Sequence, residues 1–385
     1  QLSNAPSSCH TILVMSLPMK SATPVSDDVA ALASSGPASG VGKSRMTDDM
    51  PMIRAAAELT RDLNAPNPRI YWADFLLFAI IGYAGLFLAI GAATPLAAAG
   101  WAIVAIIGLY RAGLFIHELT HIKHSAVPGF RLAWNAIIGI PLMVPSFMYE
   151  GIHSLHHART RYGTVDDPEY LPLALMKPWT VPLFVLVAAL GPVALLLRYG
   201  ILAPLSAVIP PLRTIVVERY SGLIINPVFR RRAPEGDFRR DWLLLETAAS
   251  LWAIALIAAV ITGLVPVRGF LIFLGVMSGV VVLNQIRTLV AHLWENDGDV
   301  MSVTAQFLDS VNVPPPGLLP ALWAPVGLRY HALHHLLPGL PYHALGEAHR
   351  RLSAALAPDS AYHRANYRGL PRLVVRLMGN TAKSA

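Results

Sequence analysis

The sequence has 385 residues, of which 54% are hydrophobic and 14% are charged, and its formal net charge is +7 at pH 7. Soluble domains carry roughly 25% charged residues, so this composition excludes an ordinary soluble protein and predicts a membrane protein. The single cysteine, Cys9, excludes disulfides, thiolate zinc sites and iron–sulfur clusters built from this chain alone. The basic residues lie in loops between apolar runs, which positive-inside topology explains better than nucleic-acid binding, so we expect no nucleic-acid partner.

The chain begins with a segment that shows no sustained periodic pattern. Residues 1–50 are rich in Ser, Ala, Pro and Gly, which predicts an N-terminal disordered segment. Met46 opens the stretch Met-Thr-Asp-Asp and is a plausible natural start, in which case residues 1–45 are tag or upstream sequence. We assign residues 51–357 to a catalytic membrane domain and residues 358–385 to a basic C-terminal tail.

Two apolar runs then predict a helical hairpin across the membrane. Ala73–Ala93 and Leu96–Ile116 are each long enough for the hydrocarbon core of a bilayer, and a short uncharged turn joins them. The segment before them is basic, which predicts a cytoplasmic N-terminus. The hairpin therefore returns to the cytoplasmic side at His117, where the first group of histidines begins.

The next apolar stretch, Leu132–Tyr149, separates the first group of histidines from the second. If it crossed the membrane once, the two groups would face opposite sides and could not meet. Pro141 and Pro145 interrupt it. We therefore predict a re-entrant or interfacial helix here.

The second half of the chain contains one clear hairpin and one ambiguous segment. Trp242–Val265 and Phe270–Val290 are two spans joined by a short turn. Val181–Pro210 contains Arg198 and several Pro and Gly residues, so it is either interfacial or a broken hairpin. The loop before Trp242 is rich in arginine and is predicted to be cytoplasmic. The predicted fold class is an all-α integral membrane protein with about four transmembrane helices in two hairpins, interfacial or re-entrant helices, and a cytoplasmic cap that carries the histidines.

Three histidine boxes are the most informative motifs of the chain. Residues at i, i+3 and i+4 share one face of a helix, so each box can direct two or three imidazoles at one point. Neutral imidazole is a ligand for iron, zinc and copper. The boxes are H-E-L-T-H with His117 and His121, H-S-L-H-H with His153, His156 and His157, and H-A-L-H-H with His331, His334 and His335.

The number of imidazoles indicates two metal ions rather than one. Zinc takes three or four protein ligands, which is fewer than the boxes supply. A ninth candidate, His292, follows the last span, and Asn284, Gln285 and Thr288 lie on its side of the preceding helix. Polar groups inside a span are costly, so we interpret these three as groups that orient ligands or hold water, or else as helix–helix hydrogen bonds.

The order and spacing of the boxes resemble the membrane fatty acid desaturase family from about Tyr71 to Leu352. The resemblance implies a non-haem di-iron centre, with two iron ions that use O₂ to remove hydrogen from an unactivated C–H bond. It also implies the metal ligands, which are His117, His121, His153, His156, His157, His292, His331, His334 and His335. In relatives that act on acyl thioesters, an Asn often precedes the extra histidine by four residues. Here that position is Thr288, so the head group of the substrate is open.

The resemblance implies a fatty acid or fatty acyl substrate and electrons from outside the chain. The sequence has no motif for a c-type haem, a rubredoxin centre or a fused cytochrome, so we expect a separate ferredoxin, rubredoxin or b-type cytochrome with its reductase. The arginine-rich loop would contact lipid head groups or, as a second choice, this donor. We expect a multi-pass protein of a bacterial inner membrane, with its N-terminus and histidine boxes in the cytoplasm.

The reaction type and two other classes of protein stay open. Desaturation ranks first, and terminal-alkene formation by a fatty acid decarboxylase, or hydroxylation, ranks next on the same di-iron site. The first box also matches the H-E-x-x-H pattern of membrane zinc proteases, with Glu118 as the general base, but this leaves the other boxes unexplained. A metal transporter would need ionisable residues in mid-membrane, and the interiors of the confident spans are nearly free of charge. Several carboxylates beside the boxes either orient imidazoles or are solvated charges, and His124 is a further candidate ligand. These carboxylates are Glu118, Glu150, Asp166, Asp167, Glu169, Glu295 and Asp297.

Overall fold

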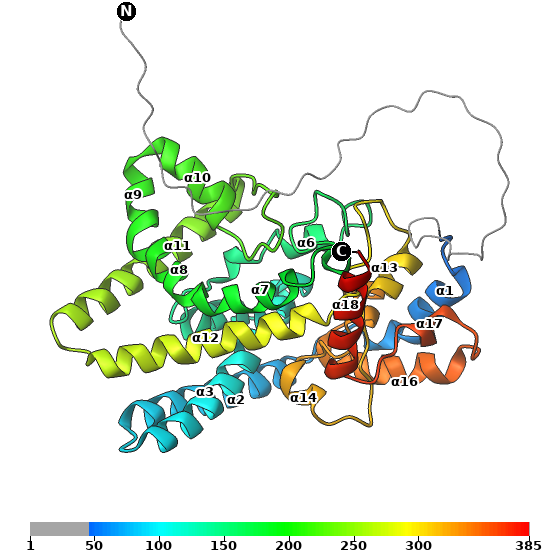
Figure 1. The fold of residues 1–385 in the computed structure, drawn as a ribbon, viewed down its shortest axis with the longest axis horizontal. Helices are drawn as coiled ribbons and strands as arrows, with labels where there is room; N and C mark the ends of the chain where they lie inside the picture. The colour runs from blue at the N-terminus through cyan, green and yellow to red at the C-terminus, as the bar shows by residue number, and fades with distance from the viewer. Residues whose placement is uncertain (1–45, 385) are drawn as a thin grey trace, which may run out of the picture. The chain divides into compact units, whose positions relative to one another are not determined.

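The structure is a computed structural model that describes residues 46–384, and these residues form helices and loops without a β-strand. Figure 1 shows the helices in chain order. The predicted start at Met46 concerns residues 1–45, which lie outside the described residues, as does Cys9. The helices are α1 (Met50–Leu59), α2 (Pro68–Gly91), α3 (Pro95–Gly113), α4 (Phe115–His121), α5 (Phe130–Trp134), α6 (His153–His156), α7 (Thr180–Leu186), α8 (Gly191–Leu197), α9 (Ala203–Val208), α10 (Pro210–Tyr220), α11 (Gly236–Ile261), α12 (Val267–Leu289), α13 (Val303–Asp309), α14 (Pro320–Trp323), α15 (His331–Leu336), α16 (Leu345–Ala355), α17 (Ala361–Arg364) and α18 (Leu370–Ser384).

Helices α2 and α3 form the first predicted hairpin, and small residues bring them into close contact. A Cβ atom on Gly108 would lie 2.5 Å from the backbone nitrogen of Gly82, and a Cβ atom on Gly85 would lie 2.7 Å from that of Ala105. Such close approach of backbones is how helices associate in a lipid, where apolar side chains gain little from leaving the solvent. The side chain of Thr94 caps α3 by accepting a hydrogen bond from the backbone of Ala97 at 3.2 Å.

Helices α11 and α12 form the second predicted hairpin and pack beside the first. Arg268, at the start of α12, donates hydrogen bonds to the backbone oxygens of Ile90 and Ala92 at the end of α2. The turns of the two hairpins therefore lie together, and in Figure 1 both hairpins extend from the cap in the same direction. The prediction of two membrane hairpins that extend from a cap is confirmed.

Within residues 46–384, five helical stretches, rather than four, are long and apolar enough to cross a membrane. The fifth is Thr180–Val208, which comprises α7, α8 and α9 and contains a 3₁₀ turn and a π-helical turn. The residues at its internal junctions keep right-handed helical dihedrals, so it is one bent helix that packs first against α12 and then against α11. Ser278, near the middle of α12, donates to the backbone oxygen of Ala189 at 2.8 Å, and further along the chain Arg198 pairs with Glu246 in the first half of α11. The interpretation of this segment as interfacial or as a broken hairpin stays a prediction.

The segment between the first two boxes folds back on itself, as predicted. It consists of α5, a π-helical turn over Asn135–Gly139 and a 3₁₀ turn over Ser146–Met148, and it is not among the candidate spans. The side chain of Asn135 accepts a hydrogen bond from the backbone of Ser146 at 2.8 Å and donates one to its hydroxyl at 2.9 Å. These two bonds close the chain reversal and return the second box to the side of the first.

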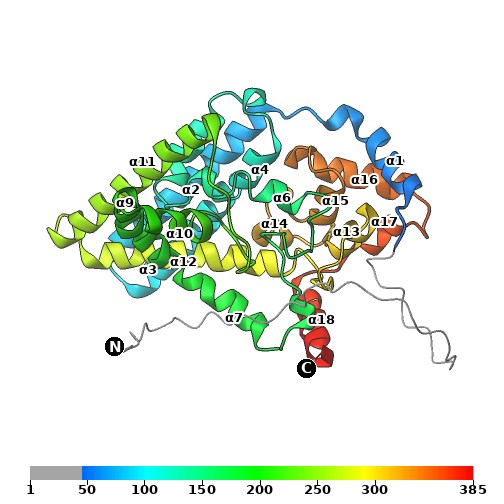
Figure 2. The same cartoon turned by 90° about the horizontal axis from the view of Figure 1, so that it is seen from above.

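The cap consists of α1 and the helices that follow α12. Its core joins Met52 of α1 to Phe307 of α13, Leu345 of α16 and Tyr362 of α17. The predicted basic tail contains α17 and α18, and α18 packs against the turn Leu173–Leu175. Figure 2 shows α4, α6, α13 and α15 lying together where the cap meets the hairpins.

Candidate metal centre

Short helices carry the three boxes, and each helix presents histidines one turn apart. His117 and His121 lie on α4, which continues α3 after a break at Leu114. The second box forms α6 and its C-cap, and the third box forms most of α15. The i, i+4 spacing therefore turns the first and last imidazole of each box to the same side. The ninth candidate, His292, lies in an extended segment just after α12.

The structure brings all nine predicted histidines together as two adjacent groups. Within each group, one side-chain nitrogen of every histidine lies within 4.8 Å of the others. The two groups do not coincide with the boxes. In the second and third boxes, the middle histidine belongs to one group and the outer two belong to the other. Cluster one is His117, His121, His153, His157 and His334, and cluster two is His156, His292, His331 and His335.

The spacing of the nitrogens fits metal coordination. The Nε2 atom of His157 lies 3.0 Å from that of His153 and 3.1 Å from that of His334, all in cluster one. In cluster two, His331 Nε2 lies 3.0 Å from His292 Nε2 and 3.2 Å from His335 Nε2. Ligands at right angles around a metal about 2.1 Å away lie about 3.0 Å apart, whereas tetrahedral ligands lie about 3.4 Å apart. Imidazole nitrogens at these separations can share one metal ion within each cluster.

Several buried imidazole nitrogens have no hydrogen-bond partner among the described residues. They include both ring nitrogens of His117 and the Nε2 atom of His121. A buried polar atom without a partner costs free energy, and native structures rarely leave one so. A bound metal ion would supply the missing interaction at one nitrogen of each ring.

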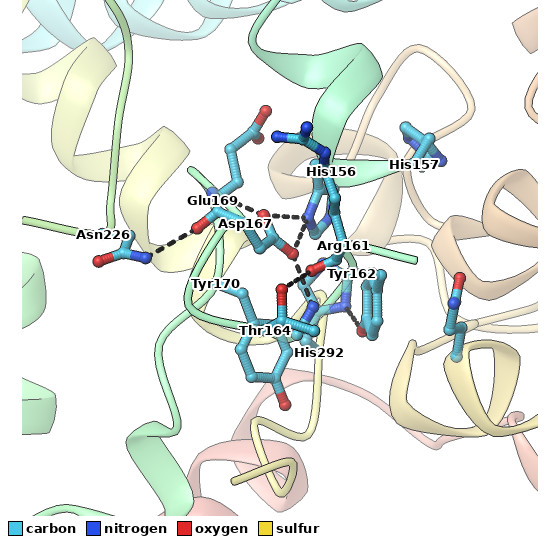
Figure 3. Close-up of polar contacts among 12 residues, drawn as sticks. His156, His157, Arg161, Tyr162, Thr164, Asp167, Glu169, Tyr170, Asn226 and His292 are labelled. Atoms are coloured by element: carbon cyan, nitrogen blue, oxygen red, sulfur yellow. Dashed lines mark hydrogen bonds and ion pairs between the residues drawn. The ribbon is translucent and has the colours of Figure 1, made fainter. Parts of the chain in front are cut away.

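Carboxylates contact two imidazoles of the second box, and Figure 3 shows Asp167 beside His156. His156 Nδ1 lies 2.9 Å from an oxygen of Asp167, whose side chain is fully buried. His153 Nδ1 lies 2.8 Å from a carboxylate oxygen of Glu169 and 2.8 Å from the hydroxyl of Tyr149. Hydrogen bonds at Nδ1 leave Nε2 unprotonated and fix the direction of its lone pair, as is usual for metal-bound histidine.

Burial keeps most of the imidazoles neutral, which is the form that binds a metal. Burial and the neighbouring imidazoles hold the pKa values of six histidines well below the ordinary value, and these are His153, His157, His292, His331, His334 and His335. The buried guanidinium of Arg287 adds to this lowering of the pKa at His292 and His331. Burial alone would lower the pKa of His156, but the charge and hydrogen bond of Asp167 outweigh burial and raise it.

Some residues singled out in the sequence lie away from the clusters. The side chain of His124 is 53% exposed and lies 3.7 Å from Glu150, so it belongs to neither cluster. Asp166 and Asp297 are exposed. Glu150 and Glu295 bind arginines. Asn284 accepts a hydrogen bond from Arg287 at 3.2 Å.

Other residues near the clusters could not be found from the sequence. Tyr162 contacts His292, and Asp309 contacts Tyr162 across 147 positions of the chain. Tyr149 is four residues before His153, which is a helical spacing, but an aromatic residue at such a spacing is common in any core.

Two comparisons with known proteins agree with this geometry. The model of the fatty acid desaturase family matches residues 93–367, which is more than half of the chain. The chain belongs to the fatty acid desaturase family. It is also 50% identical over 326 residues to a ceramide hydroxylase from Caulobacter vibrioides (strain NA1000 / CB15N), covering 85% of this chain and 93% of that protein. The chain is therefore a membrane oxidoreductase of the desaturase and hydroxylase type.

This membership excludes the zinc protease and the metal transporter. The geometry around Glu118 agrees, because its Oε2 atom accepts hydrogen bonds from the Tyr71 hydroxyl and, at 3.2 Å, from the backbone of Tyr342. This carboxylate is 3% exposed, so protein groups rather than bulk water surround it.

Proposed function

We propose that this protein hydroxylates an N-acyl sphingolipid of the ceramide class at a centre of two iron ions. The observation that carries the proposal is the combination of nine imidazoles in two adjacent groups with extended identity to a ceramide hydroxylase. Iron held there would reduce O₂ with electrons from an external donor, so that one oxygen atom enters a C–H bond and the other leaves as water.

The nine histidines supply the ligands in this proposal. His117, His121, His153, His157 and His334 would hold one iron, and His156, His292, His331 and His335 the other. The four-histidine cluster leaves more positions for oxygen ligands. The role of the protein is to keep these imidazoles neutral, aimed and shielded from bulk water, as their burial and the hydrogen bonds to Asp167 and Glu169 support.

Hydroxylation replaces desaturation as the leading reaction type. The two outcomes can share every ligand and differ in how the C–H bonds of the substrate sit beside the oxidant. The ceramide hydroxylase is similar over most of both chains, so it is the best guide to substrate and outcome. The boxes alone suit a desaturase or an alkene-forming decarboxylase equally well.

We further propose that the cap and the arginine-rich surface face the cytoplasm of a bacterium. Arg230, Arg232, Arg239 and Arg240 are exposed near the start of α11, where a positive surface suits anionic lipid head groups or an acidic electron donor. A ferredoxin, a rubredoxin or a b-type cytochrome with its reductase would supply the electrons.

Product analysis in living cells tests the proposed reaction. The chain is produced in a bacterium without ceramides, defined ceramides are supplied, and the lipids are examined by liquid chromatography with tandem mass spectrometry. We expect ceramide with one added oxygen atom from the wild type and none from His331→Ala, which removes a ligand of cluster two. His124→Ala is the matched control, since this histidine lies outside both clusters, and it should keep the product.

Other products would overturn parts of the proposal. A ceramide that has lost two hydrogen atoms would make the protein a desaturase, and 1-alkenes from supplied fatty acids would make it a decarboxylase. Product formation by His331→Ala at the wild-type rate would contradict the ligand assignment.

A further inference from the structure

His292 is the one member of the two clusters that no helical box holds in place. The other eight histidines lie on α4, α15 or α6 and its C-cap, where helical spacing fixes their mutual direction. His292 instead pairs with Ser310 in an isolated β-bridge. The backbone nitrogen of Leu293 donates to the backbone oxygen of Asp309 at 2.7 Å. The position of His292 therefore depends on the end of α13.

The imidazole of His292 is also held by its side-chain contacts. Its Nε2 atom faces His331 at 3.0 Å within cluster two, which leaves Nδ1 to bind the protein. The hydroxyl of Tyr162 lies 2.8 Å from Nδ1, and the hydroxyl of Ser310 lies 3.2 Å from it. The Ser310 hydroxyl donates to the backbone oxygen of Gln306 at 3.0 Å, so it can only accept from His292.

The hydroxyl hydrogen of Tyr162 determines which atom is the donor in the contact between Tyr162 and His292. A phenol has one hydrogen to donate, and the Tyr162 hydroxyl donates it to Oδ2 of Asp309 at 3.0 Å. The Tyr162 oxygen must then accept the hydrogen of His292 Nδ1. This arrangement selects the tautomer whose Nε2 lone pair is free for a metal. The carboxylate of Asp309 is fully buried, and it acts on the imidazole of His292 through the hydroxyl of Tyr162.

A second tyrosine, Tyr170, allows the orientation of His292 by Tyr162 to be distinguished from packing alone. The hydroxyl of Tyr170 donates to the same Oδ2 atom of Asp309 at 2.8 Å and accepts from the backbone of Asn296 at 3.1 Å. Figure 3 shows Tyr162, Tyr170 and His292 around the loop that follows the second box. Tyr162 and Tyr170 are both buried and share one acceptor, but of these two tyrosines only Tyr162 forms a hydrogen bond with His292.

We propose that Tyr162 and Asp309 are positioning residues for His292 and that they set the affinity of cluster two for its metal. This inference rests on the proposed ligand set and adds a relay that the histidine boxes do not contain. Loss of a partner that orients a metal-bound histidine typically weakens metal affinity about 10- to 100-fold. The effect should fall on cluster two alone, because the relay reaches no histidine of cluster one.

The matched variants Tyr162→Phe and Tyr170→Phe test this relay. Each full-length protein is purified in detergent, loaded with ⁵⁷Fe²⁺ without oxygen, and dialysed against increasing chelator. Iron per chain is measured, and Mössbauer spectra distinguish the two positions. In Tyr162→Phe, we expect the second iron to leave at a chelator concentration about 10- to 100-fold lower than in the wild type. Tyr170→Phe should release both irons as the wild type does, although its melting temperature falls.

Equal effects would overturn the relay. If Tyr162→Phe and Tyr170→Phe lose iron at the same chelator concentration, Asp309 acts only as a structural anchor. Asp309→Asn provides a second measurement if Tyr162→Phe does not fold, because asparagine keeps the shape and removes the charge. Retention of both irons by Asp309→Asn would also contradict the inference. A wild-type protein that binds no second iron would instead refute the proposed metal centre. The wild type is measured first, so this outcome is separate from the comparison of the variants.

Discussion

At the scale of single residues, the spacing of the boxes predicted which histidines would gather, because ligands within one box are neighbours on one helix. The residues that orient them were harder to predict. Asp167 was a candidate since it follows the second box, but Asp166 beside it looked the same in sequence. Only the fold shows that one side chain is buried against His156 and the other is exposed. Asp309 could not be predicted, because the residue through which it contacts the site, Tyr162, lies 147 positions away in the sequence.

The neighbouring aspartates give a prediction at this scale. Asp167→Asn should weaken iron binding at cluster two about 10- to 100-fold, because the carboxylate at 2.9 Å from His156 Nδ1 loses its charge. Asp166→Asn is the control and should bind iron as the wild type does. Titration of the iron-free proteins with Fe²⁺ measures both affinities. Equal affinities in the two variants would show that Asp167 does not orient a ligand.

At the scale of elements, apolar length predicted the two hairpins well, because each helix pairs with its neighbour in the chain. It did not decide the course of Thr180–Val208, since a re-entrant segment and a span have the same length and composition. The contacts of Ala189 with α12 and of Arg198 with α11 show which helices it packs against, and its path through the membrane stays a prediction. The glycines of α2 and α3 showed no function in sequence, and their role appears only where two backbones meet.

Two glycines of α3 test the packing of the first hairpin. Gly108→Val should destabilise the protein by about 1–3 kcal/mol, because a Cβ atom there would lie 2.5 Å from the backbone of Gly82 and the helices must separate. Gly100→Val is the matched control, since a Cβ atom on Gly100 would meet nothing within 4 Å. Thermal unfolding in detergent compares the two. A melting temperature of Gly108→Val at or above that of Gly100→Val would contradict the close packing.

At the scale of the whole molecule, one topological condition organises the chain. The boxes can meet only if the chain crosses the membrane an even number of times between them. The two hairpins satisfy this condition, and a single crossing by Thr180–Val208 would break it. The sequence was sufficient for this condition. It was not sufficient for the substrate, which depends on the shape around the clusters rather than on the ligands.

Labelling from the two sides of the membrane tests the path of Thr180–Val208. Single cysteines are placed in a Cys9→Ser background at Lys177, before the segment, and at Thr214, after it; neither position is buried. We expect a membrane-impermeant maleimide to reach both from the same side, and to reach a cysteine at Leu264, in the turn after α11, from the other side. Labelling of positions 177 and 214 from opposite sides would make the segment a true span.

The metal content of the purified protein tests whether the nine histidines form two iron sites. We would measure iron and zinc per chain in the wild type and in His153→Ala and His331→Ala, which remove one ligand from cluster one and cluster two, respectively. We expect about two irons per wild-type chain. Each variant should weaken the Mössbauer signal of a different iron position. A wild-type protein with one zinc and no iron, or two variants that lose the same position, would contradict the assignment of nine histidines to two iron sites.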